Sequence, residues 1–564
     1  MLDEFIHEPR VAYFSMEIAL RNEMPTYAGG LGVLAGDTVR AAADLGLPLV
    51  AVSLVSRAGY FRQEIDAQGR QIERPASWDP AAFARPLDAK IAVSIDDQTV
   101  WIGAWLYVLE GHMGGRQPVL LLDTDLAENT PENRTITHFL YGGDEAYRLK
   151  QEIVLGIGGI RMLQALGFEI RQYHMNEGHS AFLGVELLRR HSYPPEDLRP
   201  GESPYDLPRV REQCNFTTHT PVDAGHDRFD YDMVARILDR PIELATLKRL
   251  AGEDKLNMTR LALNLSEYVN GVAERHAEVS RRLFPGYHVH AITNGVHPFT
   301  WASAPFRALY DRYLPGWCHE PERLVRADCC LPAEAIWNAH SQAKLALLEQ
   351  VRVRTGVTLD PLRPVIGFAR RMTAYKRPDL LFSDIERLKA IARRYPFQIV
   401  LGGKAHPRDG DGKRLIEQLH QHARTLADTL PIAYLPEYDL DTARLLTAGA
   451  DVWLNTPLRP LEASGTSGMK AAFNGVPSLS ILDGWWIEGC IEGITGWAIG
   501  DHADTADGDA PALYDKLEHT VLPLFHEGGQ AAWIPLMRGA ISKNASYFNS
   551  HRMMRRYATE AYIG

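Results

Sequence analysis

Short apolar runs alternate with segments of helical spacing along the whole chain, and this alternation predicts an α/β protein. The strands predicted in the first half are residues 11–14, 48–55, 91–95, 100–109 and 119–122, and 91–109 should form a hairpin across a polar turn. Helical spacing occurs at residues 37–45 and 146–166. This half therefore mixes strands with longer connections.

The second half has a more regular pattern. Its predicted strands are residues 365–369, 398–402, 432–435, 452–455 and 478–482. Helices are predicted between them, near residues 379–394 and 413–427. Strands that alternate with helices of this length indicate parallel βαβ units, so a doubly wound sheet is expected.

The chain is long enough for two large domains. We predict an N-terminal Rossmann-like domain over residues 1–310 and a C-terminal one over 311–530. The helical residues 531–564 are expected to pack back on the first domain. Two doubly wound domains that face each other create a central cleft at the carboxyl ends of their strands.

Composition excludes several classes of protein. The formal net charge is −11 and no basic tract is present, which argues against nucleic-acid binding. No apolar run is long enough to span a bilayer, and the N-terminus lacks the core of a signal peptide, so a cytoplasmic location is expected.

The five cysteines match no metal motif and indicate reduced thiols. His174 and His179 are five positions apart, which would place them on different faces of a helix, so we predict no metal site.

The strongest local motif is Glu462-Ala463-Ser464-Gly465-Thr466-Ser467-Gly468-Met469-Lys470. It follows a predicted strand and opens a helix. Small residues leave backbone N–H groups free at a helix N-terminus, which can bind an anion, and Lys470 can reach the same place. The alternative is an N-capped helix with a solvated lysine.

A second motif is Gly367-Phe368-Ala369-Arg370-Arg371-Met372-Thr373-Ala374-Tyr375-Lys376-Arg377. Four cations follow a predicted strand directly, so they should face the cleft. Arginine and lysine both suit phosphate. The alternative is a solvated basic loop.

Weaker signals come from the first half. Gly29 and Gly30 allow a backbone to approach a ligand closely, but for the motif alone a plain strand–helix turn is the favoured interpretation. Polar clusters that contain His219 and Asn294 fall at predicted strand ends and could recognise hydroxyl groups, although a lone histidine is more often structural.

Taken together, these segments resemble the α-glucan phosphorylase family of glycosyltransferases. The likeness runs from Val11-Ala12-Tyr13-Phe14-Ser15-Met16-Glu17 to about Gly500. It is closest to the bacterial and archaeal branch that carries Leu482-Asp483-Gly484-Trp485-Trp486. The resemblance implies two Rossmann-like domains in the GT-B arrangement.

The resemblance also implies roles for single residues. Pyridoxal 5′-phosphate would form a Schiff base with Lys470, and its surroundings would include Thr466, Ser467, Arg370 and Tyr438. The catalytic set that holds the substrate phosphate would be Arg371, Lys376 and the amide of Gly30. The glucosyl ring would be bound by His219, Asn294, Glu462, Ser464, Gly465 and Tyr375.

The implied reaction is retaining phosphorolysis of α-1,4-glucans by orthophosphate, with α-D-glucose 1-phosphate as product. The cofactor phosphate would donate and accept the proton, so no catalytic carboxylate pair is needed. Family members are commonly dimers, which leaves a homodimer open. Two alternatives stay open: a glucan synthase-like transferase that uses a nucleotide sugar, and a catalytically idle glucan-binding relative.

Three departures from the glycogen phosphorylases stand out. Gly468 replaces an asparagine, Trp485-Trp486 replaces smaller residues, and Asp439 replaces an arginine near the cofactor phosphate. The last change predicts a weaker cationic cage. We expect both tryptophans to be core residues rather than platforms for sugar rings.

Overall fold

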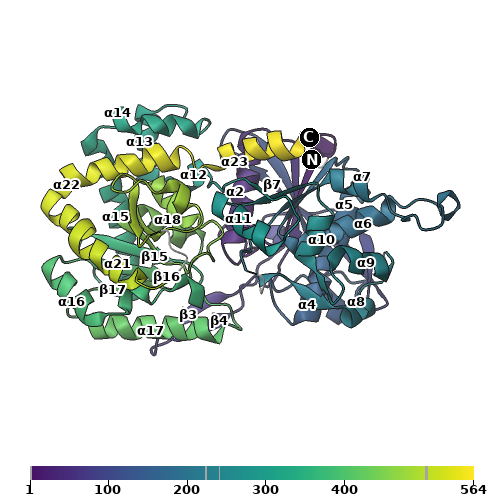
Figure 1. Ribbon diagram of the computed structural model, residues 1–564, viewed down its shortest axis with the longest axis horizontal. Coiled ribbons are helices and arrows are strands. Elements are labelled where there is room, and N and C mark those ends of the chain that lie inside the picture. Colours follow the sequence, from purple (N-terminus) through teal and green to yellow (C-terminus); the bar gives the residue numbers. More distant parts are fainter. Residues whose placement is uncertain (1–2, 223–224, 240–241, 502–505, 564) are drawn as a thin grey trace.

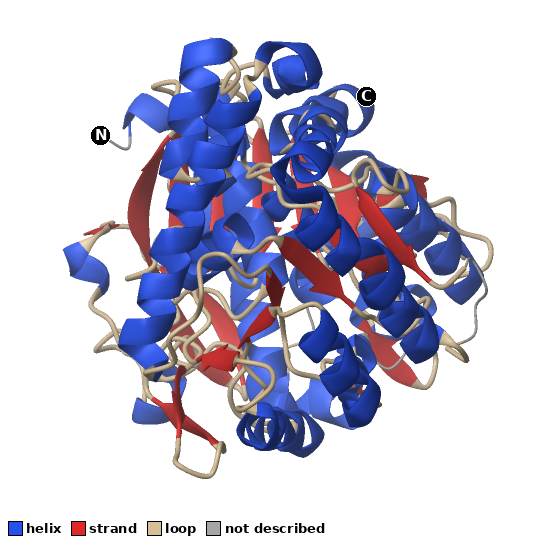
Figure 2. Ribbon diagram, turned by 90° about the vertical axis from the view of Figure 1, so that its left-hand side faces the viewer, coloured by secondary structure: helices blue, strands red, loops and turns tan. Residues whose placement is uncertain are grey.

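Two parallel-rich β-sheets, each covered by helices, organise the chain (Figure 1, Figure 2). The computed structural model describes residues 3–222, 225–239, 242–501 and 506–563. The first sheet uses strands up to residue 291, and the second uses residues 365–499. The α/β class predicted from the sequence is therefore confirmed.

The first sheet is parallel except at one edge. Its strand order is β14 (His290–Ala291), β13 (Tyr268–Gly271), β10 (Cys214–Thr217), β9 (Gln172–Asn176), β1 (Val11–Ser15), β2 (Leu49–Leu54), β8 (Arg116–Asp123), β7 (Gln98–Glu110) and β5 (Arg85–Pro86). Strand β7 is antiparallel to β8, and it forms the predicted hairpin with β6 (Ile91–Ile95). Strand β1 is buried at every position, as its continuous apolar sequence predicts.

The second sheet is entirely parallel. Its order is β17 (Ile432–Leu435), β16 (Gln398–Gly402), β15 (Val365–Ala369), β18 (Val452–Asn455), β19 (Ser478–Ile481) and β20 (Gly496–Ile499). All five predicted strands of this half are present. Strand β20 is an addition that the sequence analysis did not identify.

Both sheets reverse their strand order beside their first strand. In the first sheet the chain proceeds from β1 to β2 and β8 on one side, and then to β9 and β10 on the other. The second sheet reverses in the same way between β15 and β18. Ligands of open α/β sheets bind at such a switch point, outside the carboxyl ends of the strands. The switch points therefore lie beside residues 15–17, 176–177, 369–371 and 455–456.

Helix α2 (Gly30–Asp44) corrects one prediction, because it begins seven residues before the predicted helix 37–45. Glycines in its first turns made the sequence look like a loop. They are needed for packing, since a Cβ on Gly32 would lie 2.6 Å from Glu17 Oε2, and one on Gly36 would lie 2.1 Å from the carbonyl oxygen of Ala19. Close packing therefore overrides the low helix propensity of glycine.

The other predicted helices are present with small changes. The predicted helix 146–166 is α4 (Glu145–Ile153) and α5 (Gly159–Ala165), joined by a π-helical turn. The predicted helix 379–394 is split into a 3₁₀ turn and α16 (Ile385–Arg394), because the Asp384 side chain caps α16. Further helices are α6 (Phe182–Arg190), α15 (Ala333–Thr355), α17 (Gly410–Leu426), α18 (Leu440–Gly449), α19 (Ser467–Ala472) and α22 (Leu522–Gly539).

The C-terminal helix α23 (Ser550–Tyr557) lies on the first half, beside α2 and close to the N-terminus (Figure 1). Met553, Met554 and Tyr557 share a hydrophobic core with β1 and β2. None of the helices within the described ranges has both the length and the apolar character needed to cross a bilayer.

A hairpin of β3 (Arg62–Ile65) and β4 (Gln71–Arg74) reaches from the first half to the second, where it lies beside α17 (Figure 1). The Gln63 amide donates to the carbonyl oxygen of Gly403 at 2.8 Å, and the Gln71 amide donates to that of Ala405 at 2.9 Å. These buried bonds tie the two halves together.

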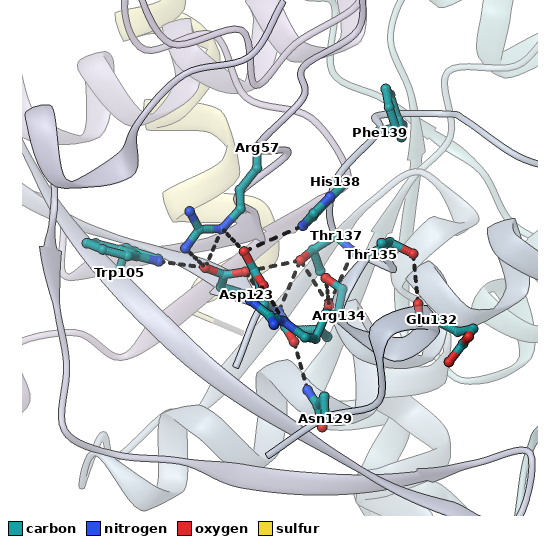
Figure 3. A network of polar contacts seen from close by, with 12 residues as sticks. Arg57, Trp105, Asp123, Asn129, Glu132, Arg134, Thr135, Thr137, His138 and Phe139 are labelled. Atoms are coloured by element: carbon teal, nitrogen blue, oxygen red, sulfur yellow. Dashed lines mark hydrogen bonds and ion pairs between the residues drawn. The ribbon is translucent and has the colours of Figure 1, made fainter. Parts of the chain in front are cut away.

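Polar contacts around Asp123 hold the loop that follows β8 (Figure 3). The Asp123 carboxylate accepts hydrogen bonds from Arg57 at 2.6 Å, from Trp105 Nε1 at 2.9 Å and from the Thr137 hydroxyl at 3.3 Å. The network fixes residues 124–138 against the end of the sheet. The chain then reaches Tyr141, which lines the pocket described next.

Candidate functional site

One pocket of about 1080 Å³ lies where the two halves meet. It lies beside both switch points, because its lining includes Glu17, Glu177 and Arg370. All fourteen residues that the sequence analysis assigned to a site line this pocket: Gly30, His219, Asn294, Arg370, Arg371, Tyr375, Lys376, Tyr438, Glu462, Ser464, Gly465, Thr466, Ser467 and Lys470.

Lys470 is a buried amine without a hydrogen-bonding partner among the described residues. It lies on α19, which starts at Ser467 as the motif predicts. The side chain is only 6% exposed, and its Nζ makes no hydrogen bond or ion pair within the described parts of the chain. Burial lowers the pKa of Lys470 to about 8, although the Asp37 carboxylate opposes this shift. A primary amine of this kind is a nucleophile at neutral pH.

Trp301 lies against Lys470 and was not identified from the sequence. Lys470 Nζ lies 4.2 Å from the centre of the Trp301 ring. The indole Nε1–H donates to Asp37 Oδ2 at 2.7 Å, which fixes the orientation of the ring. A single tryptophan carries no sequence signal for this position, since only the fold brings residues 301 and 470 together.

Glu462 pairs with two of the predicted phosphate-binding cations. Its Oε2 lies 2.6 Å from Lys376 Nζ and 2.6 Å from Arg370 Nη2, and its Oε1 lies 2.8 Å from Lys376 Nζ. Burial alone would raise the pKa of Glu462, but Arg370 and Lys376 lower it to about 2. Glu462 is therefore ionised at neutral pH.

Several buried polar atoms of the pocket have no hydrogen-bonding partner among the described residues. They are Nε and Nη1 of Arg370, Oγ of Ser464 and Oδ1 of Asn294. Buried polar atoms are almost always hydrogen-bonded in folded proteins, so unpartnered ones that line a pocket indicate a polar ligand. Arginine donors suit an anion, and the amide and hydroxyl oxygens suit hydroxyl groups.

Arg371 faces the glycine turn of the other half. It is exposed, and it has no hydrogen bond or ion pair within the part of the chain that the structure describes. A Cβ on Gly29 would lie 3.3 Å from Arg371 Nη2, so the guanidinium lies directly beside the turn. Gly30 is the first residue of α2, a helix of 15 residues whose N-terminus carries partial positive charge.

Glu17 holds this turn in place and was missed as a site residue. Its Oε2 accepts hydrogen bonds from the backbone N–H groups of Ala28 at 2.6 Å and Gly29 at 3.0 Å. Its Oε1 accepts from the Tyr141 hydroxyl at 2.9 Å. The position of Glu17 just after a buried strand is the only signal that could have indicated it.

His219 is held as a neutral donor at the pocket wall. Its Nε2 donates to Asn176 Oδ1 at 2.6 Å, and its backbone N–H donates to Glu177 Oε2 at 2.8 Å. Burial lowers the pKa of His219 to about 3, so the ring is neutral near pH 7. Glu177 belongs to a polar cluster at a predicted strand end, but the sequence assigned it no role. Its unusual φ of +75° is a strain that often marks functional sites.

The remaining predicted residues lie around Lys470 and the cations. Thr466 precedes α19, and the Ser467 hydroxyl accepts a hydrogen bond from Trp453 Nε1 at 3.0 Å. The Tyr375 ring lies 4.5 Å from Lys376 Nζ, and burial raises the pKa of Tyr438. Asp439 also lines the pocket, but its Oδ1 caps α18 by accepting from Thr442 N at 2.8 Å.

The segment 482–486 supports the loop that carries Glu462. Asp483 Oδ2 accepts from the backbone N–H of Glu462 at 2.8 Å, and Trp485 N donates to the carbonyl oxygen of Ser464 at 2.9 Å. Trp485 and Trp486 are 2% and 1% exposed, so they are core residues as expected. A Cβ on Gly468 would lie 2.7 Å from the Trp485 ring, which explains why glycine and tryptophan occur together here.

A second cluster lies outside the pocket lining and was not foreseen. Asp44 Oδ2 accepts from His297 Nε2 at 2.8 Å and from His551 Nε2 at 3.2 Å. We call these three residues the Asp44 triad. Their ligand-type atoms lie within 4.8 Å of one another, but they already bond to each other. The triad joins α2, the segment before residue 298, and α23.

The chain was also compared with known proteins. The profile described as "Carbohydrate phosphorylase" matches residues 227–492. The maltodextrin phosphorylase of Thermococcus litoralis is 40% identical over 98% of this chain and 70% of its own length. The glycogen phosphorylase of Mycobacterium tuberculosis is 39% identical over the same shares.

An uncharacterized protein of Methanocaldococcus jannaschii is 31% identical over 98% of this chain and 99% of its own length. The similarity to these relatives thus extends over almost the whole chain, including the segments that line the pocket. The chain therefore belongs to the carbohydrate phosphorylase family.

Proposed function

We propose that the protein is an α-glucan phosphorylase. Orthophosphate would cleave the terminal α-1,4 bond of a glucan such as maltodextrin, glycogen or starch and release α-D-glucose 1-phosphate. The observation that carries this proposal is the pocket, which all fourteen residues expected for cofactor, phosphate and sugar line together. The relatives named maltodextrin phosphorylase and glycogen phosphorylase support the same reaction.

The surroundings of Lys470 fit pyridoxal 5′-phosphate. The amine is buried and unpartnered among the described residues, and its lowered pKa favours reaction with an aldehyde. Thr466, Ser467, Arg370 and Tyr438 line the same pocket and would hold the rest of the cofactor. When bound, pyridoxal 5′-phosphate supplies a phosphate group that can donate and accept a proton.

Arg371, Lys376 and the amide of Gly30 would hold the orthophosphate. Two phosphate groups in one pocket repel each other unless cations neutralise them. Arg370, Arg371 and Lys376 bring three positive charges to the lining, and the N-terminus of α2 adds a partial one. The same charges keep the attacking phosphate oxygen beside the sugar.

The sugar would be held on the side of the pocket where polar atoms lack partners among the described residues. Asn294 Oδ1 and Ser464 Oγ have no partner among the described residues, and hydroxyl groups of a glucosyl ring can donate to them. His219, Gly465 and Tyr375 line the same pocket. Glu462 is ionised, so it is unsuited to protonate the glycosidic oxygen and suited to accept from sugar hydroxyls.

In the proposed reaction, the bond between C1 of the terminal glucose and the glucan oxygen breaks, and that oxygen takes up the proton that orthophosphate carries. A phosphate oxygen forms the new bond to C1 on the same face, which retains the α-configuration. We also propose the GT-B arrangement, with domains 1–310 and 311–530 facing the pocket. Of the residues 531–564 that were expected to return to the first domain, Met553 and Tyr557 share a core with β1. Trp533, Met537 and Ile541 instead pack in the core of the second half, so only the end of the segment returns.

The test is an assay of the purified protein with maltodextrin and orthophosphate, in which glucose 1-phosphate is measured. We expect a yellow protein that forms glucose 1-phosphate only when orthophosphate is present, and a borohydride-stable adduct on Lys470. Glucan elongation from a nucleotide sugar, without need for orthophosphate, would instead identify a synthase-like transferase. Glucan retention without either reaction would identify an idle binding protein.

A further inference from the structure

Glu462 occupies a place that the proposed reaction needs for phosphate. Its carboxylate lies within 2.8 Å of Lys376 Nζ through both oxygens and within 2.6 Å of Arg370 Nη2. Lys376 and Glu462 are only 7% and 9% exposed, so water screens their charges weakly. In this structure the carboxylate is the counter-ion of the two cations.

A substrate phosphate and the Glu462 carboxylate cannot share Lys376 in this geometry. Both are anions, and at hydrogen-bonding distance from one ammonium group they would repel each other strongly inside the protein. Arg371 is the cation of this set that has no hydrogen bond or ion pair among the described residues, and it lies beside the glycine turn. Phosphate can therefore reach Arg371 first, but it reaches Lys376 only if Glu462 moves.

The surroundings of Glu462 allow its side chain to move while its backbone stays fixed. The backbone N–H donates to Asp483 Oδ2 at 2.8 Å, which anchors the loop. Gly465 has a φ of +85°, and a Cβ there would lie 3.3 Å from Glu462 Cγ, so the glycine keeps space free beside the side chain. Ser464 Oγ, from the same loop, lacks a partner among the described residues and marks a place for hydroxyl groups.

Resting on the α-glucan phosphorylase function above, we propose that Glu462 is an exchangeable counter-ion. In the holoenzyme Arg370 is left to the cofactor, and the carboxylate neutralises Lys376 while no substrate phosphate is bound. When phosphate takes Lys376, the carboxylate turns to the hydroxyl groups of the sugar. Each substrate then prepares the site of the other, and by thermodynamic linkage orthophosphate and sugar tighten each other's binding by the same factor.

The test is calorimetric binding of orthophosphate to the holoenzyme, with and without glucose. Glucose has no glycosidic bond, so no reaction interferes. In the wild type, we expect glucose to tighten orthophosphate binding by about fivefold or more. In Glu462→Gln, orthophosphate without glucose should bind about tenfold more tightly, because the competing charge is gone, and glucose should no longer change its affinity.

Glu186→Gln is the matched control. Glu186 is a buried carboxylate that pairs with Arg161, Arg189 and Arg190, and it does not line the pocket. Its loss changes the net charge equally and should leave both affinities unchanged. Weaker or unchanged orthophosphate binding in Glu462→Gln would overturn the proposal, as would equal tightening in the control.

Absence of coupling between glucose and orthophosphate in the wild type also overturns the exchange, and this measurement needs no variant that must fold. The binding data are independent of turnover. If phosphorolysis is found but the coupling is absent, the counter-ion proposal fails alone. If orthophosphate binds but no glucan is cleaved, the function assigned above fails instead.

Discussion

Two buried clusters of this protein each combine one carboxylate with two basic side chains, but they differ in how many of their hydrogen-bonding groups have partners. In one, Glu462 lies between Lys376 and Arg370; in the other, Asp44 lies between His297 and His551. In the Asp44 triad, each side-chain nitrogen and oxygen has a partner, including Met113 N for Asp44 Oδ1 and the carbonyl oxygen of His319 for His551 Nδ1. In the Glu462 cluster, Nε and Nη1 of Arg370 have none among the described residues.

The comparison shows that burial of charge does not by itself mark a functional site. A cluster whose hydrogen-bonding groups are all satisfied can hold the fold together, and the Asp44 triad connects α2 to α23, far apart in the sequence. A cluster that leaves donors unsatisfied beside a pocket carries an energetic cost that a ligand removes. Lys470, unpartnered among the described residues in the same pocket, belongs to this second kind.

The largest effect is expected for Lys470→Ala. Without the amine, covalent capture of pyridoxal 5′-phosphate should be abolished and phosphorolysis should fall by about a thousandfold or more. Stability should change little, since the amine has no polar partner among the described residues. Absorbance after borohydride reduction and peptide mapping measure the adduct. Lys413→Ala is the control, because Lys413 pairs with Glu73 away from the pocket; retained adduct in Lys470→Ala would contradict the assignment.

Asp44→Ala should affect stability instead. Burial lowers the pKa of His297, so Asp44 accepts a hydrogen bond from a neutral ring there. Removing the carboxylate leaves buried donors unsatisfied at about 1–3 kcal/mol each, so the urea midpoint should fall markedly. The folded variant should still capture the cofactor on Lys470, because Asp44 does not line the pocket. Asp411→Ala, which removes an exposed carboxylate, should leave the midpoint unchanged. If Asp44→Ala lost cofactor capture while its urea midpoint stayed unchanged, the Asp44 triad would serve the pocket rather than the stability of the fold.

The stabilisation by Asp44 should also depend on pH. Burial alone would raise the pKa of Asp44, but hydrogen bonds from His297 and His551 lower it. A carboxylate with a lowered pKa stabilises the fold above its unfolded pKa of about 3.9 and loses that contribution as the pH falls further. The difference in urea midpoint between wild type and Asp44→Ala should therefore be largest near neutral pH and shrink in acid.

Two glycines of the pocket region should respond differently to alanine. A Cβ at Gly468 would lie 2.7 Å from the Trp485 ring, so Gly468→Ala should cost about 1–3 kcal/mol. A Cβ at Gly30 meets no atom of the described residues within 4 Å, so Gly30→Ala should leave the urea midpoint nearly unchanged while it weakens orthophosphate binding. Equal urea midpoints for the two variants would contradict this prediction, because they would mean that the Trp485 ring shifts to accommodate the new Cβ without loss of stability.

The smallest effect concerns the pH dependence of cofactor capture by Lys470. Its pKa of about 8 means that the neutral, nucleophilic amine becomes tenfold scarcer with each pH unit below that value. The rate of adduct formation in the apoprotein should rise tenfold per unit up to about pH 8 and then level off. Stopped-flow absorbance measures it, and a rate that keeps rising to pH 10 would mean an unperturbed amine.

Much of the fold could be predicted because strands such as β1 and β18 are short, continuous apolar runs. The start of α2 could not be predicted, because glycines are typical of loops. Only the structure shows that Gly32 packs against Glu17 and Gly36 against Ala19. The site motifs on β15 and α19 were visible as local clusters of cations and small residues. Glu17 and Trp301 were missed because each is an isolated residue whose role depends on distant partners.

The sequence by itself determined the α/β class, the motifs around Arg370 and Lys470, and the family resemblance, because these depend on local pattern and order. Only the tertiary structure decided which charges meet. It paired Glu462 with Lys376 across 86 positions and Asp44 with His551 across 507, and it left Lys470 unpartnered among the described residues. The physical reason is that ion pairs and burial depend on distances in space, which residue spacing along the chain does not contain.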